Sequence, residues 1–364
     1  MPHRTRRISA YSAYLTLEGA LSLFSTLVFT LAAVYRVQVA GLNPLQLVLV
    51  GTVMECSIFV FQLPTGVIAD VFSRRLSIIV GVIIMGAGIV LEGLVPRFGV
   101  ILLAQAIWGL GYTFSSGATE AWIADEVGPD LVGNTYMRGA QIGQITRPLG
   151  ILAVVTLGSL RLNVPYLAGG TLMMALGLLL VLIMPERPHH HAQPGGGRAS
   201  WRELGATMGQ GLSLVRTRPA LLAILGVGLF LGLYSEGYDR LSDAHFLKDL
   251  TFPPLGHLSY VVWFGIFDMG GTLLSLVATE VVRRRVDLAS ARAVARALVG
   301  MTGLLSASVI AFGLAPTFGL AVACVWAIAV LRSTIDPLYT AWLAQHTDSS
   351  VRATVISIAG QVDA

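Results

Sequence analysis

The sequence is short of charge. Only 12% of its 364 residues are Asp, Glu, Lys or Arg, whereas an ordinary soluble domain carries about 25%. Apolar residues make up 55% of the chain, and its mean hydropathy is +0.74. A soluble chain of this size would have too few polar side chains to cover its surface. The composition therefore argues against a soluble fold and favours a chain surrounded by lipid.

Cysteine and lysine are also scarce. Cys56 and Cys324 both lie in apolar stretches, so we expect neither a disulfide framework nor a metal site. Lys248 is the only lysine among the 24 basic residues. The net charge of +4 lies mainly in short loops, and we therefore expect no nucleic-acid partner. The sequence contains no phosphate-binding loop and no nucleophile with a base at motif spacing, so it predicts no enzyme and no cofactor.

Long apolar runs are what the chain has instead. A bilayer core about 30 Å thick needs roughly 20 apolar residues per helix, and ten such runs can be identified. The start of an eleventh lies near Val351, and the sequence ends at Ala364. We therefore expect an all-α polytopic membrane protein. Its expected spans are about 12–37, 44–68, 76–95, 98–124, 133–158, 164–184, 219–246, 257–282, 292–313 and 316–343.

The basic residues alternate between the loops of the two sides. Loops on one side hold 17 of them, and the other side holds five, which are Arg36, Arg97, Arg161, Arg240 and Lys248. Because short loops rich in arginine stay in the cytoplasm, this pattern predicts a cytoplasmic N-terminus. The basic N-terminal tail leads into a retained first helix and not into a cleaved signal. We expect a multi-pass protein of the cytoplasmic membrane.

A polar stretch divides the chain after the sixth run. Residues 185–218 are rich in Pro and Gly, as is typical of a linker. Within them, residues 201–214 have the pattern of a short amphipathic helix on the membrane surface. We expect a six-helix half at 1–184, this linker, and an incomplete second half at 219–364.

A short motif follows the second run. It reads Gly66-Val67-Ile68-Ala69-Asp70-Val71-Phe72-Ser73-Arg74-Arg75, and we expect Gly66 to break the helix. The motif resembles the loop between helices two and three of the major facilitator superfamily, roughly G-x-x-x-D-x-x-G-R-R, with Ser73 in place of the usual glycine. The resemblance covers essentially the whole chain. It implies two six-helix pseudo-repeats, the second incomplete, with ten full spans and the start of an eleventh.

The resemblance also implies a cytoplasmic gate at this motif. Asp70 would face the start of helix eleven, because the positive end of a helix favours a carboxylate. Arg74 would pair with Asp125 or Glu126 at the cytoplasmic end of the fourth span. The alternative is that Arg74 and Arg75 only anchor the topology.

Two further motifs of the family differ here. Proton-coupled members often carry an arginine in helix four, where this chain has Gln105. Drug antiporters often carry G-x-x-x-G-P-x-x-G-G in helix five, where Gly143–Gly150 keeps the proline but has Arg147 in place of the middle glycine. These departures concern the type of transporter and leave the expected fold unchanged.

Charged side chains inside the first six spans are candidates for the transport path. A charge at membrane depth costs several kcal/mol, so it is rare without a function. The candidates are Glu18, Glu55, Glu120 and Arg147. We expect Arg147 to be the counter-charge of one of these acids and to serve the role of the missing helix-four arginine.

The second half has its own charged candidates. Glu236 is four residues from Arg240, so the two can pair on one helix face. Arg332 and Asp336 have the same spacing, and their pair is either functional or only a structural neutraliser. Asp268 has no neighbour of opposite charge in the sequence, which favours a functional role.

Aromatic residues near these charges are candidate substrate contacts, namely Tyr112, Tyr238 and Phe267. The resemblance implies a secondary active transporter that works by alternating access. We expect proton-linked efflux of a small amphipathic compound by a monomer, with the substrate, protons and lipid as its partners. One alternative is a symporter that imports a metabolite, and another is a truncated protein that does not transport.

Overall fold

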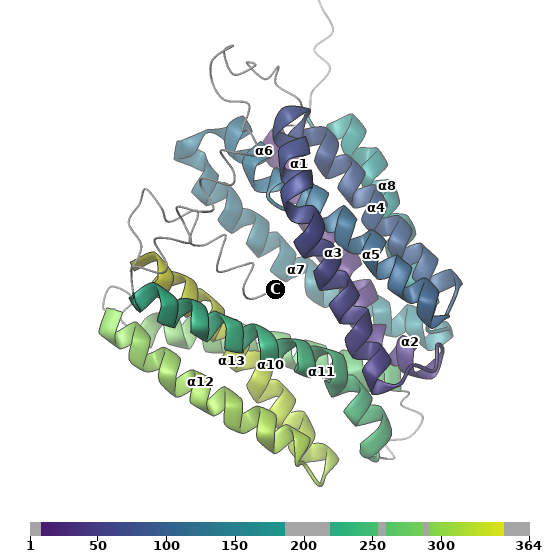
Figure 1. Ribbon diagram of the computed structural model, residues 1–364, viewed down its shortest axis with the longest axis vertical. Helices are drawn as coiled ribbons and strands as arrows, with labels where there is room; N and C mark the ends of the chain where they lie inside the picture. The colour runs from purple at the N-terminus through teal and green to yellow at the C-terminus, as the bar shows by residue number, and fades with distance from the viewer. Residues whose placement is uncertain (1–8, 186–218, 254–259, 287–290, 346–364) are drawn as a thin grey trace, which may run out of the picture. The chain divides into compact units, whose positions relative to one another are not determined.

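The computed structural model describes residues 9–185, 219–253, 260–286 and 291–345, and the chain divides into unit 1 (Met1–Arg198) and unit 2 (Ala199–Ala364). Within those residues every regular element is a helix, and there is no strand (Figure 1). The helices of unit 1 are α1 (Ala10–Phe29), α2 (Ala32–Gln38), α3 (Pro44–Val71), α4 (Arg74–Leu94), α5 (Phe98–Ser115), α6 (Ala118–Val127), α7 (Pro129–Leu160) and α8 (Val164–Ile183). The helices of unit 2 are α10 (Pro219–Asp249), α11 (Tyr260–Arg285), α12 (Ala291–Gly313) and α13 (Phe318–Gln345).

These helices confirm the predicted all-α polytopic fold. Each predicted span overlaps one helix or two consecutive helices. Nine stretches of the described residues are long and apolar enough to cross a membrane, and α10 is not one of those nine. The predicted linker, its surface helix and the start of helix eleven fall on residues 186–218 and 346–364, outside the described residues. The predicted domain boundaries therefore stay a prediction.

Two of the predicted spans are interrupted. The first is divided into α1 and α2 at Thr30–Leu31, where Leu31 has φ −116° and ψ 12°. The fourth is divided into α5 and α6 at Ser116–Gly117. Gly117 has φ +72°, a conformation that a residue with a Cβ rarely adopts, so the glycine makes this break possible.

The prediction that Gly66 breaks the helix is wrong. Helix α3 continues through Gly66 to Val71, because the cost of one glycine inside a helix, about 1 kcal/mol, is small beside the hydrogen bonds of a long helix. The turn comes at Phe72 and Ser73. The Ser73 side chain accepts a hydrogen bond from the backbone N–H of Leu76 at 3.1 Å. Ser73 is thus the N-cap of α4, a position that serine favours.

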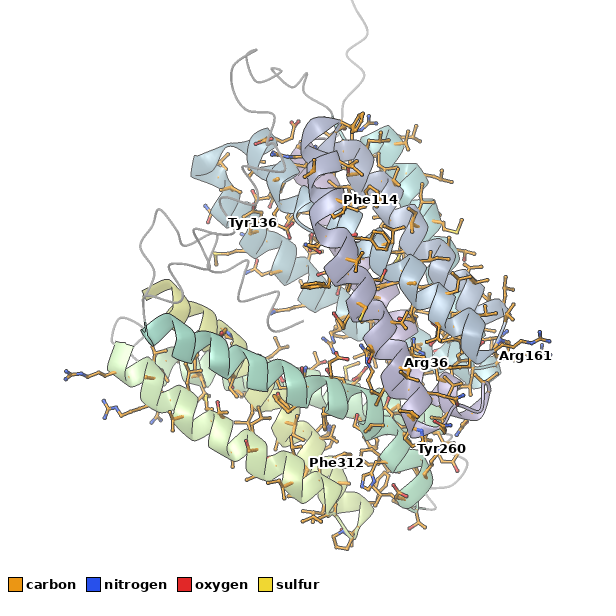
Figure 2. The ribbon with its side chains drawn as sticks, viewed as in Figure 1. Arg36, Phe114, Tyr136, Arg161, Tyr260 and Phe312 are labelled. Atoms are coloured by element: carbon orange, nitrogen blue, oxygen red, sulfur yellow. The ribbon has the colours of Figure 1, made fainter. Side chains whose placement is uncertain are left out.

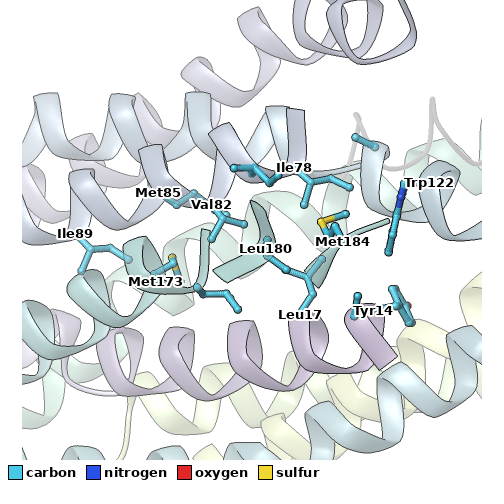
Figure 3. Packing of buried hydrophobic residues seen from close by; sticks show 14 of the residues in the cluster. Tyr14, Leu17, Ile78, Val82, Met85, Ile89, Trp122, Met173, Leu180 and Met184 are labelled. Carbon is cyan, nitrogen blue, oxygen red and sulfur yellow. The ribbon is translucent and has the colours of Figure 1, made fainter. Parts of the chain in front are cut away.

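Helix α4 is the centre of unit 1, with α5 and α8 packed along it. Glycines bring the backbones close, since a Cβ added at Gly81 would lie 2.6 Å from the carbonyl oxygen of Gly111. The same distance separates a Cβ at Gly86 from the carbonyl oxygen of Gly170. Small residues at such seams are typical of helices that associate in lipid. Figure 3 shows the apolar side chains along α4, with those of α8 and α1 around them.

The described part of unit 2 is held together by aromatic packing. Phe246 of α10 is buried, and its ring lies 4.8 Å from that of Phe267 of α11 and 5.5 Å from that of Phe312 of α12. The indole N–H of Trp326 on α13 donates to the carbonyl oxygen of Phe267 at 3.1 Å. Gly270 leaves room for this indole, which lies 2.7 Å from the position of an added Cβ. Four helices thus meet at one aromatic cluster.

Candidate functional site

The gate motif makes one of its expected contacts. Arg74, the first residue of α4, forms an ion pair with Asp125 of α6 and also donates to the carbonyl oxygen of Ala121 at 3.3 Å. Arg75 donates to the carbonyl oxygen of Val181 on α8. The two arginines therefore join α4 to two neighbouring helices, which goes beyond an anchor for topology. Their role in gating stays a prediction.

The remaining members of the motif are less informative. Asp70 belongs to α3, but its side chain lies outside the described residues, as does its expected partner at the start of helix eleven. Glu126 is half-buried on α6 beside Asp125. We call the end of unit 1 that holds Arg74 the Arg74 end.

Two of the predicted acids of unit 1 come together near the Arg74 end. Glu18 of α1 lies within electrostatic range of Glu120 of α6. Tyr14 lies close to both carboxylates, and its ring is 6.3 Å from that of Tyr136 on α7. The hydroxyl of Tyr136, labelled in Figure 2, donates to the backbone carbonyl of Glu120 at 2.9 Å. Three helices thus place two carboxylates and two phenols in one cluster.

The other two charged candidates of unit 1 do not join this cluster. We expected Arg147 to neutralise one of the acids, but the structure places it in no ion pair with any described residue. The reason is its direction on α7: Thr146 packs against Gly19 of α1, and the next side chain points about 100° away. Arg147 is exposed on that other face. Glu55 is half-buried on α3.

A buried polar network, which we did not predict, lies at the opposite end of unit 1. Arg36 Nε donates to Glu92 Oε1 at 2.8 Å, and Arg36 Nη2 donates to Glu92 Oε2 at 3.3 Å. Gln105 Nε2 donates to Glu92 Oε2 at 2.6 Å, and the Tyr166 hydroxyl donates to Oε1 at 3.1 Å. Arg36 is 5% exposed, Glu92 1%, Gln105 5% and Tyr166 1%. We call these four residues the Glu92 network.

This network corrects the sequence analysis at two positions. Arg36 was counted among the loop charges, but it lies in α2 within unit 1 (Figure 2). Gln105 was noted only because it stands where related transporters have an arginine, and its side chain donates a hydrogen bond to the Glu92 carboxylate. The signal for the network is present in the sequence, since Glu92 is the single charge of the run 76–95 and Arg36 lies within the run 12–37.

An ion pair between two helices of unit 2 was also missed. Arg332 of α13 forms a two-bond ion pair with Asp239 of α10, and its Nη2 lies 2.9 Å from Asp239 Oδ2. We expected the partner to be Asp336, whose side chain lies outside the described residues. The predicted pair of Glu236 with Arg240 is present, at 3.2 Å between Oε2 and Nε.

Asp268 is near a second carboxylate that we did not select. Asp243 of α10 lies within electrostatic range of Asp268 of α11 and of Asp239. Tyr238 lies near Asp243, Asp239 and Arg332. These five residues of α10, α11 and α13, which are three acids, one arginine and one tyrosine, therefore form a polar cluster in unit 2. Across the described ranges, no three acidic, histidine or cysteine side chains converge as they would around a metal ion.

The three aromatic candidates differ in their surroundings. Tyr112 is exposed, and its ring stacks on that of Trp108, with 5.4 Å between the ring centroids and 13° between the ring planes. The ring of Phe29 on α1 lies edge-on to that of Trp108, with 5.5 Å between the centroids. Tyr238 packs on Phe312 at 5.6 Å. Phe267 is only 6% exposed inside the aromatic cluster of unit 2. Its contact with a substrate stays a prediction.

Known proteins with similar sequences are transporters. The Major Facilitator Superfamily model matches residues 15–362. The chain is 24% identical over 324 residues to the uncharacterized MFS-type transporter YxaM of Bacillus subtilis (strain 168), which covers 88% of this chain and 77% of that protein. It is 26% identical over 121 residues to macrolide efflux protein A of Streptococcus pyogenes, a match of 32% of this chain and 30% of that protein.

Solved structures with the same fold are also transporters. A point mutant of the nucleoside transporter NupG superimposes with a TM-score of 0.75 at 14% identity, over 98% of this chain and 88% of that one. A D-xylose–proton symporter superimposes with a TM-score of 0.63 at 15% identity, over 96% and 85% of the two chains. At these identities the likeness shows the fold.

The fold, the apolar helices of the described residues and these similarities define the class of protein, which is a multi-pass secondary transporter of small molecules. The chain belongs to the major facilitator superfamily. This is a family of transporters and not of enzymes.

Proposed function

We propose that this chain exports small amphipathic cations in exchange for protons across the cytoplasmic membrane, as a monomer. The observation that carries the proposal is that acids of different helices lie near one another. Asp243 lies near Asp268 and Asp239 in unit 2, and Glu18 lies near Glu120 in unit 1. Carboxylates that repel each other favour the arrival of a positive charge, because it removes the repulsion. A proton and a cationic substrate both meet that need, so they compete.

The exposed aromatic group of unit 1 supports an amphipathic substrate. Tyr112, Trp108 and Phe29 present two stacked rings and one edge-on ring. Flat aromatic faces bind planar apolar groups and also attract cations. The partial similarity to macrolide efflux protein A supports the outward direction.

The charge of the loops supports an orientation with the N-terminus and the Arg74 end in the cytoplasm. In that orientation the contact of Arg74 with Asp125 is a cytoplasmic one, which fits a gate that holds α4 to α6 in one state and releases them in the other. Glu18 and Glu120 then lie nearer the cytoplasmic side, where a substrate for export enters.

The test uses the purified full chain in proteoliposomes, with ethidium as a planar cationic probe. An imposed pH gradient should drive ethidium across the membrane against its own gradient. Asp243→Asn should abolish this uphill transport and retain downhill equilibration, because the variant binds substrate but no longer exchanges it for a proton. Glu280→Gln is the matched control, since Glu280 pairs with Arg284 on the outside of α11, and it should transport like the parent.

Three results would contradict the proposal. If ethidium is not transported across the membrane under any condition, export of cations is excluded. Uphill transport by Asp243→Asn at the parent rate removes Asp243 from proton coupling. Uptake of a nucleoside or sugar together with protons, in place of ethidium exchange, favours the importing symporter.

A further inference from the structure

The Glu92 network lies apart from the carboxylates of the proposed transport path. Along α4, Glu92 is 18 residues from Arg74, which corresponds to about 27 Å. Its carboxylate accepts hydrogen bonds from α2, α5 and α8 at the same time. Because three side chains, one of them the Arg36 guanidinium, already donate hydrogen bonds to it, this carboxylate is poorly suited to carry protons in a transport cycle. Its hydrogen bonds are suited to holding α4 in a fixed position against α2, α5 and α8.

The network holds only the outer part of the first span. Arg36 and Tyr35 both belong to the short helix α2, beyond the break at Thr30–Leu31. The Tyr35 hydroxyl donates to the backbone carbonyl oxygens of Glu92 at 2.9 Å and Gly93 at 3.3 Å. These carbonyls belong to the last turn of α4, where partners within the helix are lacking. Side chain and backbone of α4 are therefore both tied to α2.

The inner part of the same span has different contacts. Helix α1 packs along α7, where the Ser22 hydroxyl donates to the carbonyl oxygen of Gly143 at 2.8 Å. A Cβ added at Gly150 of α7 would lie 2.8 Å from the Thr26 side chain. Helix α1 also packs against α8 and contributes to the apolar core around α4. The inner part of the span is therefore held mainly by apolar packing, with the Ser22 hydrogen bond beside it, whereas α2 is held by a buried ion pair.

We propose that Arg36 and Glu92 are positioning residues that fix α2 to α4, α5 and α8, so that the first span bends at Thr30–Leu31 when the transporter changes state. The ion pair is buried in both partners, so separating it in the membrane leaves two charges without compensation. The break interrupts the helical hydrogen bonds and offers less resistance. The expected change of state with pH rests on the proposed proton coupling, whereas the effect of Arg36 and Glu92 on the α2–α4 distance does not.

The test measures distances between spin labels in the full chain in nanodiscs, after Cys56 and Cys324 are replaced by Ser. One pair of labels at Val39 and Leu94 reports α2 against α4, and a second pair at Tyr11 and Leu76 reports α1 against α4. All four positions are exposed. In the parent protein, the α2–α4 distance should stay single and narrow between about pH 5 and pH 8, the range in which carboxyl groups with raised pKa values titrate. The α1–α4 distance should shift between these conditions.

The double variant Arg36→Met/Glu92→Gln isolates the positioning role. It removes both charges together, which avoids an unpaired buried charge and preserves stability. We expect the narrow α2–α4 distance to be lost and a longer one to appear, with the α1–α4 distances as in the parent. Arg284→Met/Glu280→Gln is the matched control at an exposed pair and should change neither distance. Arg36→Lys keeps the charge and should restore the narrow distance.

Two results would overturn the proposal. An unchanged α2–α4 distance in the double variant means that apolar packing alone fixes α2. Equal broadening of both label pairs means that the network only contributes general stability. If the double variant yields no folded protein, Arg36→Gln replaces it, because this change removes the cation of the α2–α4 pair and leaves Glu92 with its neutral donors Gln105 and Tyr166. A narrow α2–α4 distance in Arg36→Gln likewise counts against the proposal.

Discussion

At the scale of single residues, the ion pair of Arg332 with Asp239 links α13 to α10, and its contribution to stability can be measured. Either single change, Asp239→Asn or Arg332→Gln, removes this ion pair, so each should lower the melting temperature in detergent. The double variant should be more stable than the sum of the two losses predicts. Because both side chains are partly exposed, we expect a coupling energy of about 1 kcal/mol.

The measurement is thermal unfolding of the parent, both single variants and the double variant. Losses that simply add would show that the ion pair contributes nothing beyond its two members. Arg240→Gln is a useful comparison, since Arg240 and Glu236 pair within one helix and the expected loss is only about 0.3–0.5 kcal/mol.

The sequence predicts contacts between residues that lie close together in the chain or in a known motif. Glu236 with Arg240 follows from helical spacing, and Arg74 with Asp125 follows from the resemblance. The pairs of Arg332 with Asp239 and of Arg36 with Glu92 were not found. They join different helices, and which side chains meet there depends on how each helix is rotated about its axis. A single sequence carries little information on that rotation.

At the scale of elements, the length of apolar runs predicts where helices lie, because the bilayer sets the length of a span. The breaks at Thr30–Leu31 and Ser116–Gly117 are not visible in this pattern, since a break changes a few dihedral angles without changing the apolar composition. Gly66 shows the opposite error. A glycine permits a break but does not require one, and α3 continues through it.

The close contacts at the glycines of α4 lead to a prediction about helix packing. Gly86→Ala places a methyl group 2.6 Å from the carbonyl oxygen of Gly170, so two backbones must move apart. We expect a loss of about 1–3 kcal/mol, measured as a lower melting temperature. Gly303→Ala in α12 is the matched control, because a Cβ there meets nothing within 4 Å. It should keep or raise the melting temperature, since alanine favours a helix by about 1 kcal/mol over glycine.

Equal losses in the two alanine variants would contradict this interpretation. They would mean that the glycines matter through backbone flexibility, which both changes reduce, and not through close approach. A loss confined to Gly86→Ala would instead locate the stability of unit 1 in its backbone contacts.

At the scale of the whole molecule, the direction of transport depends on which end of unit 1 faces the cytoplasm. The proposed orientation rests on the distribution of arginine between the loops. Removing Arg36 from the loop count does not weaken it, because Arg36 was on the poorly charged side. The buried position of Arg36 makes the asymmetry of the loops larger.

Labelling of introduced cysteines in whole cells tests this orientation. The parent for this test has Cys56 and Cys324 replaced by Ser. Arg97→Cys lies at the end of unit 1 that holds the Glu92 network, and Phe72→Cys lies at the Arg74 end. Both positions are exposed. A membrane-impermeant maleimide should label Arg97→Cys in intact cells and Phe72→Cys only after the cells are permeabilised. Arg161→Cys, also exposed, should behave like Arg97→Cys because five and three spans, respectively, separate the two positions from the N-terminus. The reverse pattern would place the Arg74 end outside and the Glu18–Glu120 cluster nearer the external side, so the same charges and aromatic group would then favour uptake over export.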